Sequence, residues 1–135
     1  MDFIKSSTEC YPLIAAAADV CMKPWKHAVV NQASIAKESF QSEDYFELDL
    51  RLECRSKEGH RHPENDLELE IYRSGVDVNL MLTWCNQLER PILWQGQHSV
   101  WIDANSGNRC EGPMECECSL LEALARRIRA LFVND

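Results

Sequence analysis

Apolar residues recur at every second position between Tyr45 and Cys85, in three successive segments. A period of two residues is typical of an antiparallel strand that packs one face on a core and turns the other toward solvent. The first segment, YFELDLRLEC, shows it most clearly, because its alternate positions are charged. The inward residues are Phe46, Leu48, Leu50, Leu52 and Cys54. The pattern therefore predicts a sheet with one apolar face and one charged face.

The segments at 67–71 and 76–84 repeat this alternation and predict the next two strands. Ser74 and Gly75 lie between them and predict a two-residue hairpin turn, because glycine adopts positive φ at little cost. A hairpin centred there pairs apolar residues with apolar residues: Leu69 with Leu80, Ile71 with Val78, and Leu67 with Leu82. The segment PILWQGQHSVWID predicts one or two further strands, with Val100 and Ile102 facing the core.

Two amphipathic helices are predicted near the ends of the chain. The first runs from about Glu9 to Met22, before Pro24, which cannot continue a helix. Its buried side should consist of Ile14, Ala17, Ala18 and Cys21. The second is SLLEALARRIRALF, which a capping box of Ser119 and Glu122 is expected to open.

The segment 27–40, HAVVNQASIAKESF, fits both an alternating and a helical spacing. We favour a strand, because short connections usually join neighbouring strands, and keep a helix as the alternative. The order helix, meander, helix predicts an α+β fold. Its antiparallel meander should have about four to five strands, with the N-terminal and C-terminal helices packed on one face. The chain of 135 residues suits a single domain, 1–135.

Composition and charge narrow the partners that we expect. The chain has 22 acidic and 14 basic residues and a net charge of -8, which repels the phosphates of nucleic acids and anionic membranes. The longest apolar run, at 13–18, is too short to cross a membrane. The number of cysteines is odd, seven, and they are scattered, which is unlike a secreted disulfide framework. We expect a soluble cytoplasmic protein with reduced thiols and no nucleic-acid or membrane partner.

A metal site is one candidate for chemistry. Three cysteines and one histidine can bind zinc tetrahedrally, and a polar loop carries two histidines. The residues concerned are Cys110, Cys116, Cys118, His60 and His62. The spacing Cys-x5-Cys-x-Cys differs from the paired Cys-x2-Cys of zinc ribbons, and neighbouring glutamates disfavour thiolates. We therefore expect no cofactor, and keep a zinc site or a thiol-redox pair as the alternative.

The outward face of the predicted sheet is the second candidate. It gathers five acids, Glu47, Asp49, Glu53, Glu68 and Glu70, which on an open sheet usually form a solvated face. By the alternation, Tyr72, Met81 and Trp101 fall on the same side, whereas Trp84 and Trp94 fall in the core. Exposed aromatic residues beside methionine mark interaction surfaces. The predicted partner-binding residues are Tyr72, Met81, Trp101, Glu68 and Glu70.

No sequence motif of a common enzyme class is present. The chain has no glycine-rich phosphate loop, nucleophile elbow or His-Glu-x-x-His helix. We therefore predict a non-catalytic interaction or regulatory module that uses the outward sheet face to bind a protein partner or a second copy as a homodimer. One alternative is the zinc or thiol-redox protein described above. The other is an enzyme or small-ligand binder with a pocket between the helices and the sheet.

Overall fold

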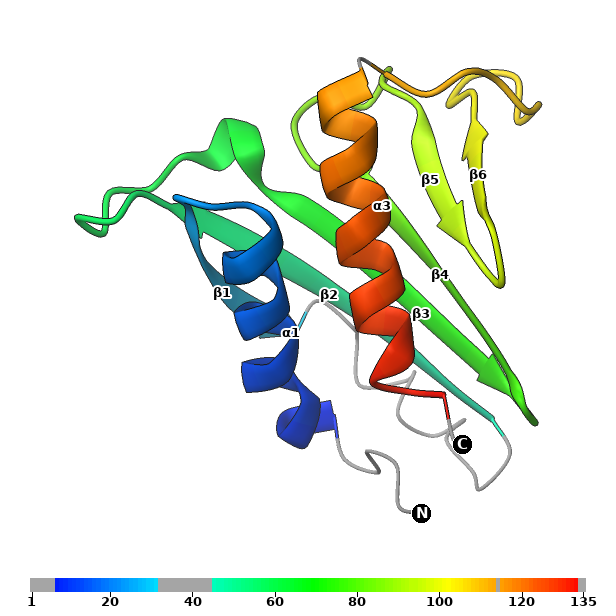
Figure 1. Cartoon of the computed structure of the whole chain (residues 1–135), viewed down its shortest axis with the longest axis horizontal. Helices are drawn as coiled ribbons and strands as arrows, with labels where there is room; N and C mark the ends of the chain where they lie inside the picture. Colours follow the sequence, from blue (N-terminus) through cyan, green and yellow to red (C-terminus); the bar gives the residue numbers. More distant parts are fainter. Residues whose placement is uncertain (1–6, 32–44, 114, 134–135) are drawn as a thin grey trace.

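In the part of the chain that the structure describes, six antiparallel strands form one sheet, and each strand pairs with its neighbours along the chain (Figure 1). The strands are β1 (Lys26–Asn31), β2 (Tyr45–Arg55), β3 (Leu67–Ser74), β4 (Asp77–Trp84), β5 (Ile92–Gln95) and β6 (Ser99–Ile102). The predicted antiparallel meander is confirmed. The expected number of four to five strands is wrong, because 92–102 forms a complete hairpin and 26–31 adds an edge strand.

The computed structural model describes residues 7–31, 45–113 and 115–133, and of residues 7–9, 31, 45–46 and 115–117 it describes the backbone alone. The strand predicted within 27–40 is therefore confirmed as far as Asn31, and the rest of that segment lies outside the described residues. None of the helices in these ranges is long and apolar enough to span a membrane.

Within the described ranges, two α-helices cover one face of the sheet, as predicted, and the fold class is α+β (Figure 1). Helix α1 (Ser7–Cys21) packs against β1, whereas α3 (Glu115–Ala130) packs against β4 and β5. The two helices also contact each other. A short 3-10 helix, η1 (Pro63–Asn65), lies in the connection between β2 and β3.

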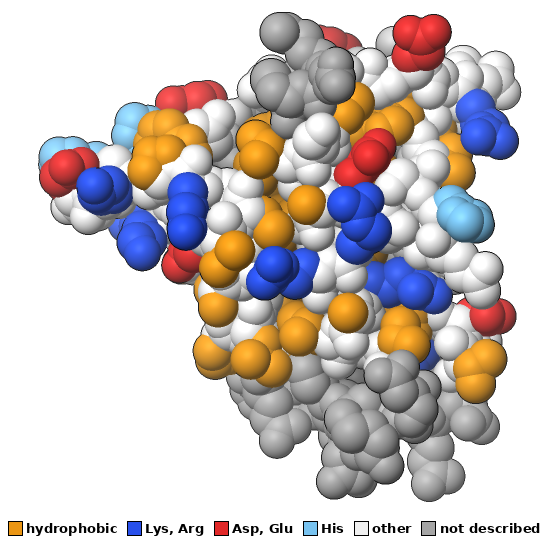
Figure 2. Space-filling model, in the orientation of Figure 1, with side chains coloured by type: hydrophobic (Ala, Val, Ile, Leu, Met, Phe, Trp, Pro, Cys, Tyr) orange, Lys and Arg blue, Asp and Glu red, His pale blue; other side chains and the backbone are white. Residues whose placement is uncertain are grey.

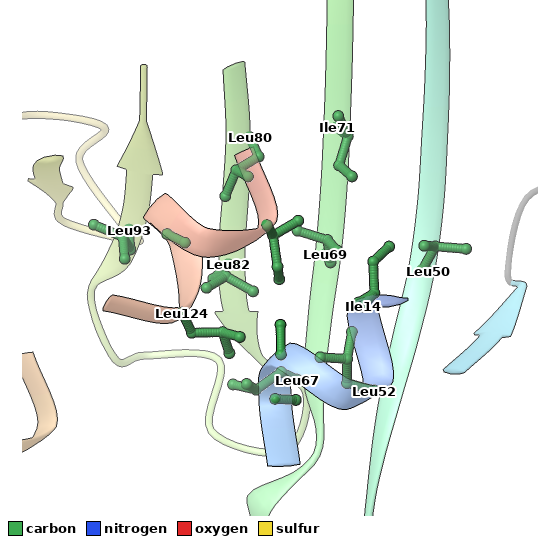
Figure 3. Packing of buried hydrophobic residues seen from close by; sticks show 14 of the residues in the cluster. Ile14, Leu50, Leu52, Leu67, Leu69, Ile71, Leu80, Leu82, Leu93 and Leu124 are labelled. Carbon is green, nitrogen blue, oxygen red and sulfur yellow. The ribbon is translucent and has the colours of Figure 1, made fainter. Parts of the chain in front are cut away.

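The core lies between this helical layer and the inward side of the sheet (Figure 3). Ile14 of α1 and Leu124 of α3 point toward leucines of β2, β3 and β4. Along β3 buried and half-buried residues alternate as far as Arg73, which matches the period of two in the sequence. Each fully buried leucine contributes roughly 1.5–3 kcal/mol to folding. The predicted inward faces of β2, β3 and β4 are thus confirmed, except at Phe46, whose side chain lies outside the described residues.

The hairpin between β3 and β4 is shifted by one residue from the predicted turn. Ser74 pairs with Asp77, so Gly75 and Val76 form the turn, and Gly75 has a φ of 63° at its first position. Hairpin turns of type II′ place glycine there. The inward pairs are consequently Leu67 with Trp84, Leu69 with Leu82 and Ile71 with Leu80, which replace the predicted pairs.

Helix α3 begins four residues before the predicted cap. It starts at Glu115, so Ser119 lies inside the helix and forms no capping box with Glu122. At the other end of the helix, the Nε atom of Arg129 donates a hydrogen bond of 2.8 Å to the carbonyl oxygen of Val78. This bond ties the last turn of α3 to β4.

The β5–β6 hairpin has the opposite orientation from the predicted one. Leu93 and Trp101 lie opposite each other and face the core, whereas Trp94 and Val100 face outward. The prediction of an inward Val100 and Ile102 is therefore wrong. The outward side of this hairpin is wholly apolar, whereas the polar residues Gln95 and Ser99 lie on the core side with Leu93 and Trp101. The polar positions therefore mark the wrong side as the solvent side, and the prediction exchanges the two faces.

Candidate functional site

The outer face of the sheet, opposite the helices, is divided into an acidic half and an apolar half. The five predicted acids lie half-buried on β2 and β3. Asp49 lies directly opposite Glu70, and Arg51 lies opposite Glu68. The first of these pairs places two carboxylates side by side, and the second places an arginine beside a glutamate. We call these acids the outer acidic patch: Glu47, Asp49, Glu53, Glu68 and Glu70.

Tyr72 and Met81 lie on this outer face, as predicted. The hydroxyl group of Tyr72 donates a hydrogen bond of 2.9 Å to Oε1 of Glu70. Met81 lies between Glu70 on β3 and Trp94 on β5. These two residues therefore stand where the acidic half meets the apolar half.

The apolar half is formed by β4, β5 and β6. Met81, Trp94 and Val100 lie opposite one another in a row across these strands, and Ile92 lies opposite Ile102. Each of these side chains is half-buried. We call this set the outer apolar patch: Met81, Ile92, Trp94, Val100 and Ile102.

Trp101 is not part of the outer face, so its predicted outward orientation is wrong. Its side chain is only 8% exposed, and its Nε1 atom donates a hydrogen bond of 2.8 Å to Oε2 of Glu122 on α3. Trp94, which we predicted in the core, takes the outward place instead. The outer face therefore does contain a tryptophan, but it is Trp94 and not the predicted Trp101.

The helix-covered face has a different character. Figure 2 shows hydrophobic side chains interspersed with those of Lys and Arg on this side of the molecule. Leu13 and Val20 of α1 are exposed there, as are Arg126 and Arg127 of α3. The concentration of acids on β2 and β3 therefore contrasts with the basic residues of α3.

The structure does not bring the predicted histidine ligands to the cysteines. His60 and His62 lie in the connection between β2 and β3, which is on the opposite side of the molecule from the connection after β6 (Figure 1). His62 contacts Oε2 of Glu64 at 3.2 Å through Nδ1 and packs against the ring of Trp25.

The cysteines of the predicted metal site lie at the end of the β6 connection and the start of α3. Cys110 is half-buried, and the thiol of Cys118 donates a hydrogen bond of 3.0 Å to the carbonyl oxygen of Pro113. The side chain of Cys116 lies outside the described residues. Among those that are described, no group of three His, Cys, Asp or Glu residues is arranged to hold a metal ion.

Asp66 anchors the connection between β2 and β3. Its carboxylate is fully buried and accepts hydrogen bonds from Arg51, from Arg61 and from the amide of Cys54, at 2.7–3.2 Å. Burial raises the pKa of this carboxyl, but the hydrogen bonds outweigh it and lower the pKa to about 2. Asp66 is therefore ionised at neutral pH and holds the loop on β2.

A pocket of about 140 Å³ lies between the turn that follows α1 and the first half of α3. The start of β1, the ends of β2 and β4, and η1 contribute its other walls. The lining residues include Met22, Trp25, His27, Cys54, Trp84 and Leu121. The sequence left the existence of such a pocket open.

His27 is a buried titratable residue among those that line this pocket. Its side chain is 1% exposed, and its Nδ1 atom lies 3.1 Å from Oδ1 of Asp19. Burial lowers the pKa of His27, although the hydrogen bond and the charge of Asp19 act in the opposite direction. The imidazole is therefore neutral at physiological pH.

Cys54 lies directly opposite His27 on the neighbouring strand. The thiol of Cys54, the imidazole of His27 and the carboxylate of Asp19 thus follow one another in space, as the corresponding groups do in enzymes with a cysteine nucleophile. Burial and the charge of Asp66 raise the pKa of the Cys54 thiol to about 11, however. The thiol is protonated at neutral pH and is not an activated nucleophile.

Sequence reasoning missed His27, Asp19 and Asp66. His27 and Asp19 are eight residues apart on different elements, so neither forms a motif with the other. Asp66 is one of several polar residues in an eleven-residue loop. Its position gave a weak signal, because Asp66 comes immediately before the buried Leu67. A charged residue that is buried there needs hydrogen bonds or opposite charges to compensate for the loss of water.

Comparison with known families matches the chain over residues 11–131 to a family described as Domain of unknown function (DUF8659). The chain belongs to the DUF8659 family. No curated protein and no solved structure matches it. The outer patches and the pocket all lie within the DUF8659 domain, so they are features of the family region of this chain.

Proposed function

We propose that this DUF8659 protein is a non-catalytic interaction module that binds a protein partner through the outer face of its sheet. The observation that carries the proposal is the outer apolar patch, in which Met81, Trp94 and Val100 lie side by side across three strands. Both described helices lie on the opposite face. A half-buried tryptophan beside methionine and branched aliphatic residues is the usual composition of the centre of an interface.

Charge indicates the kind of partner. The outer acidic patch borders the apolar residues at Glu70 and Met81, which lie opposite each other. A partner with an apolar centre and basic residues at one rim would complement both halves. A second copy that used the whole face would bring acids toward acids in a chain of net charge -8. We therefore favour a different protein over a homodimer.

The open surface of the outer face favours binding without catalysis. The outer acids lie on an open sheet, where water solvates them, and general acid-base catalysis needs enclosed groups. We place the module in the cytoplasm, because the odd number of cysteines in the chain is typical of a reducing compartment.

Substitution of Trp94 tests the proposal. Affinity capture with the wild-type protein should retain a partner that Trp94→Ser loses and that the charge reversal Glu70→Lys weakens. Leu88→Ser is the matched control, because Leu88 is a hydrophobic residue 68% exposed in the loop between β4 and β5, outside the patch. A partner retained equally by all the variants would contradict the proposal.

Light scattering of the same variants separates the two kinds of partner. The proposal expects a monomeric wild-type protein in the absence of its partner. A wild-type dimer that Trp94→Ser dissociates would replace the proposed partner by a second copy. A dimer that none of the variants dissociates would place self-association on another surface and contradict the proposed role of this face.

A further inference from the structure

The side chains of the pocket that a ligand can touch are partly apolar and partly polar. Met22, Trp25 and Leu120 are half-buried or exposed, and so are Lys23 and Asn65. The other side chains that line the pocket are buried and offer a ligand little surface: His27, Cys54, Trp84 and Leu121. The volume of about 140 Å³ is close to that of engineered cavities of roughly 150 Å³, which bind benzene. One small ring therefore fits against the accessible apolar side chains.

Lys23 gives the pocket a positive charge. Among the described residues that line it, Lys23 alone is charged at neutral pH, because the imidazole of His27 is neutral and the thiol of Cys54 is protonated. Lys23 is exposed, and none of the ion pairs between described residues involves it. Ligand pockets commonly combine apolar walls with a charged group that orients the ligand. An ammonium group beside an apolar pocket favours a ligand that is apolar at one end and negative at the other.

The wall that carries Asn65 and Trp25 is preformed. Asn65 belongs to η1, and its backbone amide donates a hydrogen bond of 2.9 Å to the carbonyl oxygen of His62. The next residue, Asp66, is anchored on β2 by the hydrogen bonds to its carboxylate. The ring of Trp25 packs against that of His62, with 4.7 Å between the ring centroids. These contacts hold both lining residues in place, so a ligand would not have to order them.

We propose that this pocket binds small apolar carboxylates of about the size of benzoate, with the ring against Met22, Trp25 and Leu120 and the carboxylate at Lys23 and Asn65. A carboxylate accepts hydrogen bonds from an ammonium group and from a side-chain amide. The net charge of -8 acts against an anion, but physiological salt screens charges beyond about 8 Å, so the nearby Lys23 dominates. The inference is independent of the proposed partner surface, which lies on the other face of the sheet.

Titration with benzoate and with benzamide at neutral pH tests the proposal, because the two probes are similar in shape and differ in charge. The indole N–H signal of Trp25 in a ¹H–¹⁵N correlation spectrum reports binding, and the signal of Trp94 on the outer face is the internal reference. Trp25→Phe and Trp94→Phe identify the two signals among those of the four tryptophans. Benzoate should shift the Trp25 signal saturably and leave that of Trp94 in place. Benzamide should bind about three- to fivefold more weakly, the effect of one partly exposed ion pair.

Two variants of exposed residues test the charge at the pocket without disturbing the core. Lys23→Gln should reduce the affinity for benzoate to about that for benzamide and leave the affinity for benzamide nearly unchanged. Lys26→Gln is its control, because Lys26 is an exposed lysine on β1 that does not line the pocket. Leu120→Glu should also weaken benzoate, since it places a negative charge at a lining residue that is 43% exposed. Leu88→Glu is the control with the same substitution at an exposed leucine outside the pocket.

Three results would overturn the inference. Equal affinity of the wild-type protein for benzoate and benzamide would show that the charge of the ligand plays no part. An affinity for benzoate that Lys23→Gln leaves unchanged would place the anion away from this pocket. A Trp25 signal that neither probe moves, up to the solubility of benzamide, would show that no small ring binds there.

Discussion

The indole Nε1 of Trp101 donates a hydrogen bond of 2.8 Å to Oε2 of Glu122, and this contact joins the edge strand β6 to helix α3. The two residues are 21 positions apart and belong to different layers. The bond satisfies the polar atom of a tryptophan that is otherwise buried in the core. It therefore fixes how the end of the sheet meets the helical layer.

Trp101→Phe should lower the free energy of unfolding by about 2 kcal/mol, because it removes a hydrogen bond to a charged group and leaves a smaller ring. Glu122→Gln is the milder variant, since an amide oxygen still accepts from Nε1. Urea unfolding at neutral pH measures both. Equal stability of Trp101→Phe and the wild type would show that this bond does not hold α3 on the sheet.

Gly112 lies where a side chain would collide with this same contact. A Cβ atom at position 112 would be 2.5 Å from Sγ of Cys118 and 2.8 Å from Nε1 of Trp101. Gly112→Ala should therefore destabilise the protein by about 1–3 kcal/mol through overpacking. The double variant Gly112→Ala with Cys118→Ala should recover part of the loss in thermal unfolding. No recovery would assign the whole effect to Trp101 or to the backbone.

Acid should weaken the fold through Asp66. The pKa of this carboxyl is about 2 in the folded protein, against an ordinary value of 3.8, so the folded state favours the ionised form. The resulting stability is present above pH 4 and is lost as the pH falls from about 4 toward 2. Its size is about 2 kcal/mol. Denaturant unfolding at a series of pH values measures it.

Asp66→Asn should remove this acid-dependent stability and cost about 2 kcal/mol or more at neutral pH. The asparagine keeps the shape of the side chain but not the charge that Arg51 and Arg61 bind. Wild type and variant should therefore converge in stability as the pH approaches 2. A stability difference that stays constant over this range would mean that the charge of Asp66 is not responsible.

Buried His27 should give a second, separate dependence on pH. Its pKa lies below 6.5 in the folded protein, so the folded state favours the neutral imidazole. The stability from this group is present above pH 6.5 and is lost as the pH falls through the lowered pKa. His27→Gln, which does not titrate, should flatten the stability profile between pH 7 and pH 5. An unchanged profile would assign that slope to other groups.

The sequence predicted those elements in which one face is apolar and the other polar. Strand β2 alternates leucine with charged residues, so only one register buries its apolar side. The helix that contains Leu124 and Ile128 is equally well marked by its helical spacing. In both elements the need to bury one side leaves a single solution that can be recognised without the structure.

The errors lie where this contrast is missing. Trp94 and Trp101 lie on opposite faces of a hairpin whose polar residues, Gln95 and Ser99, are on the core side, and the sequence pattern exchanged the two tryptophans. Val76 is 91% exposed in a turn, although its apolar character suggested the start of a strand. The pocket could not be predicted at all, because Asp19, His27 and Trp84 come together only when α1 packs on the sheet.

The meander topology also determines the order in which contacts can form during folding. Each strand pairs with the strand that precedes or follows it in the chain, so the sheet can grow by closing short loops, whose entropic cost is small. The contact between α1 and α3 is different, because it joins the two ends of the chain. Packing α1 on α3 therefore closes a loop of nearly the whole chain, whose entropic cost is larger than that of any hairpin in the sheet.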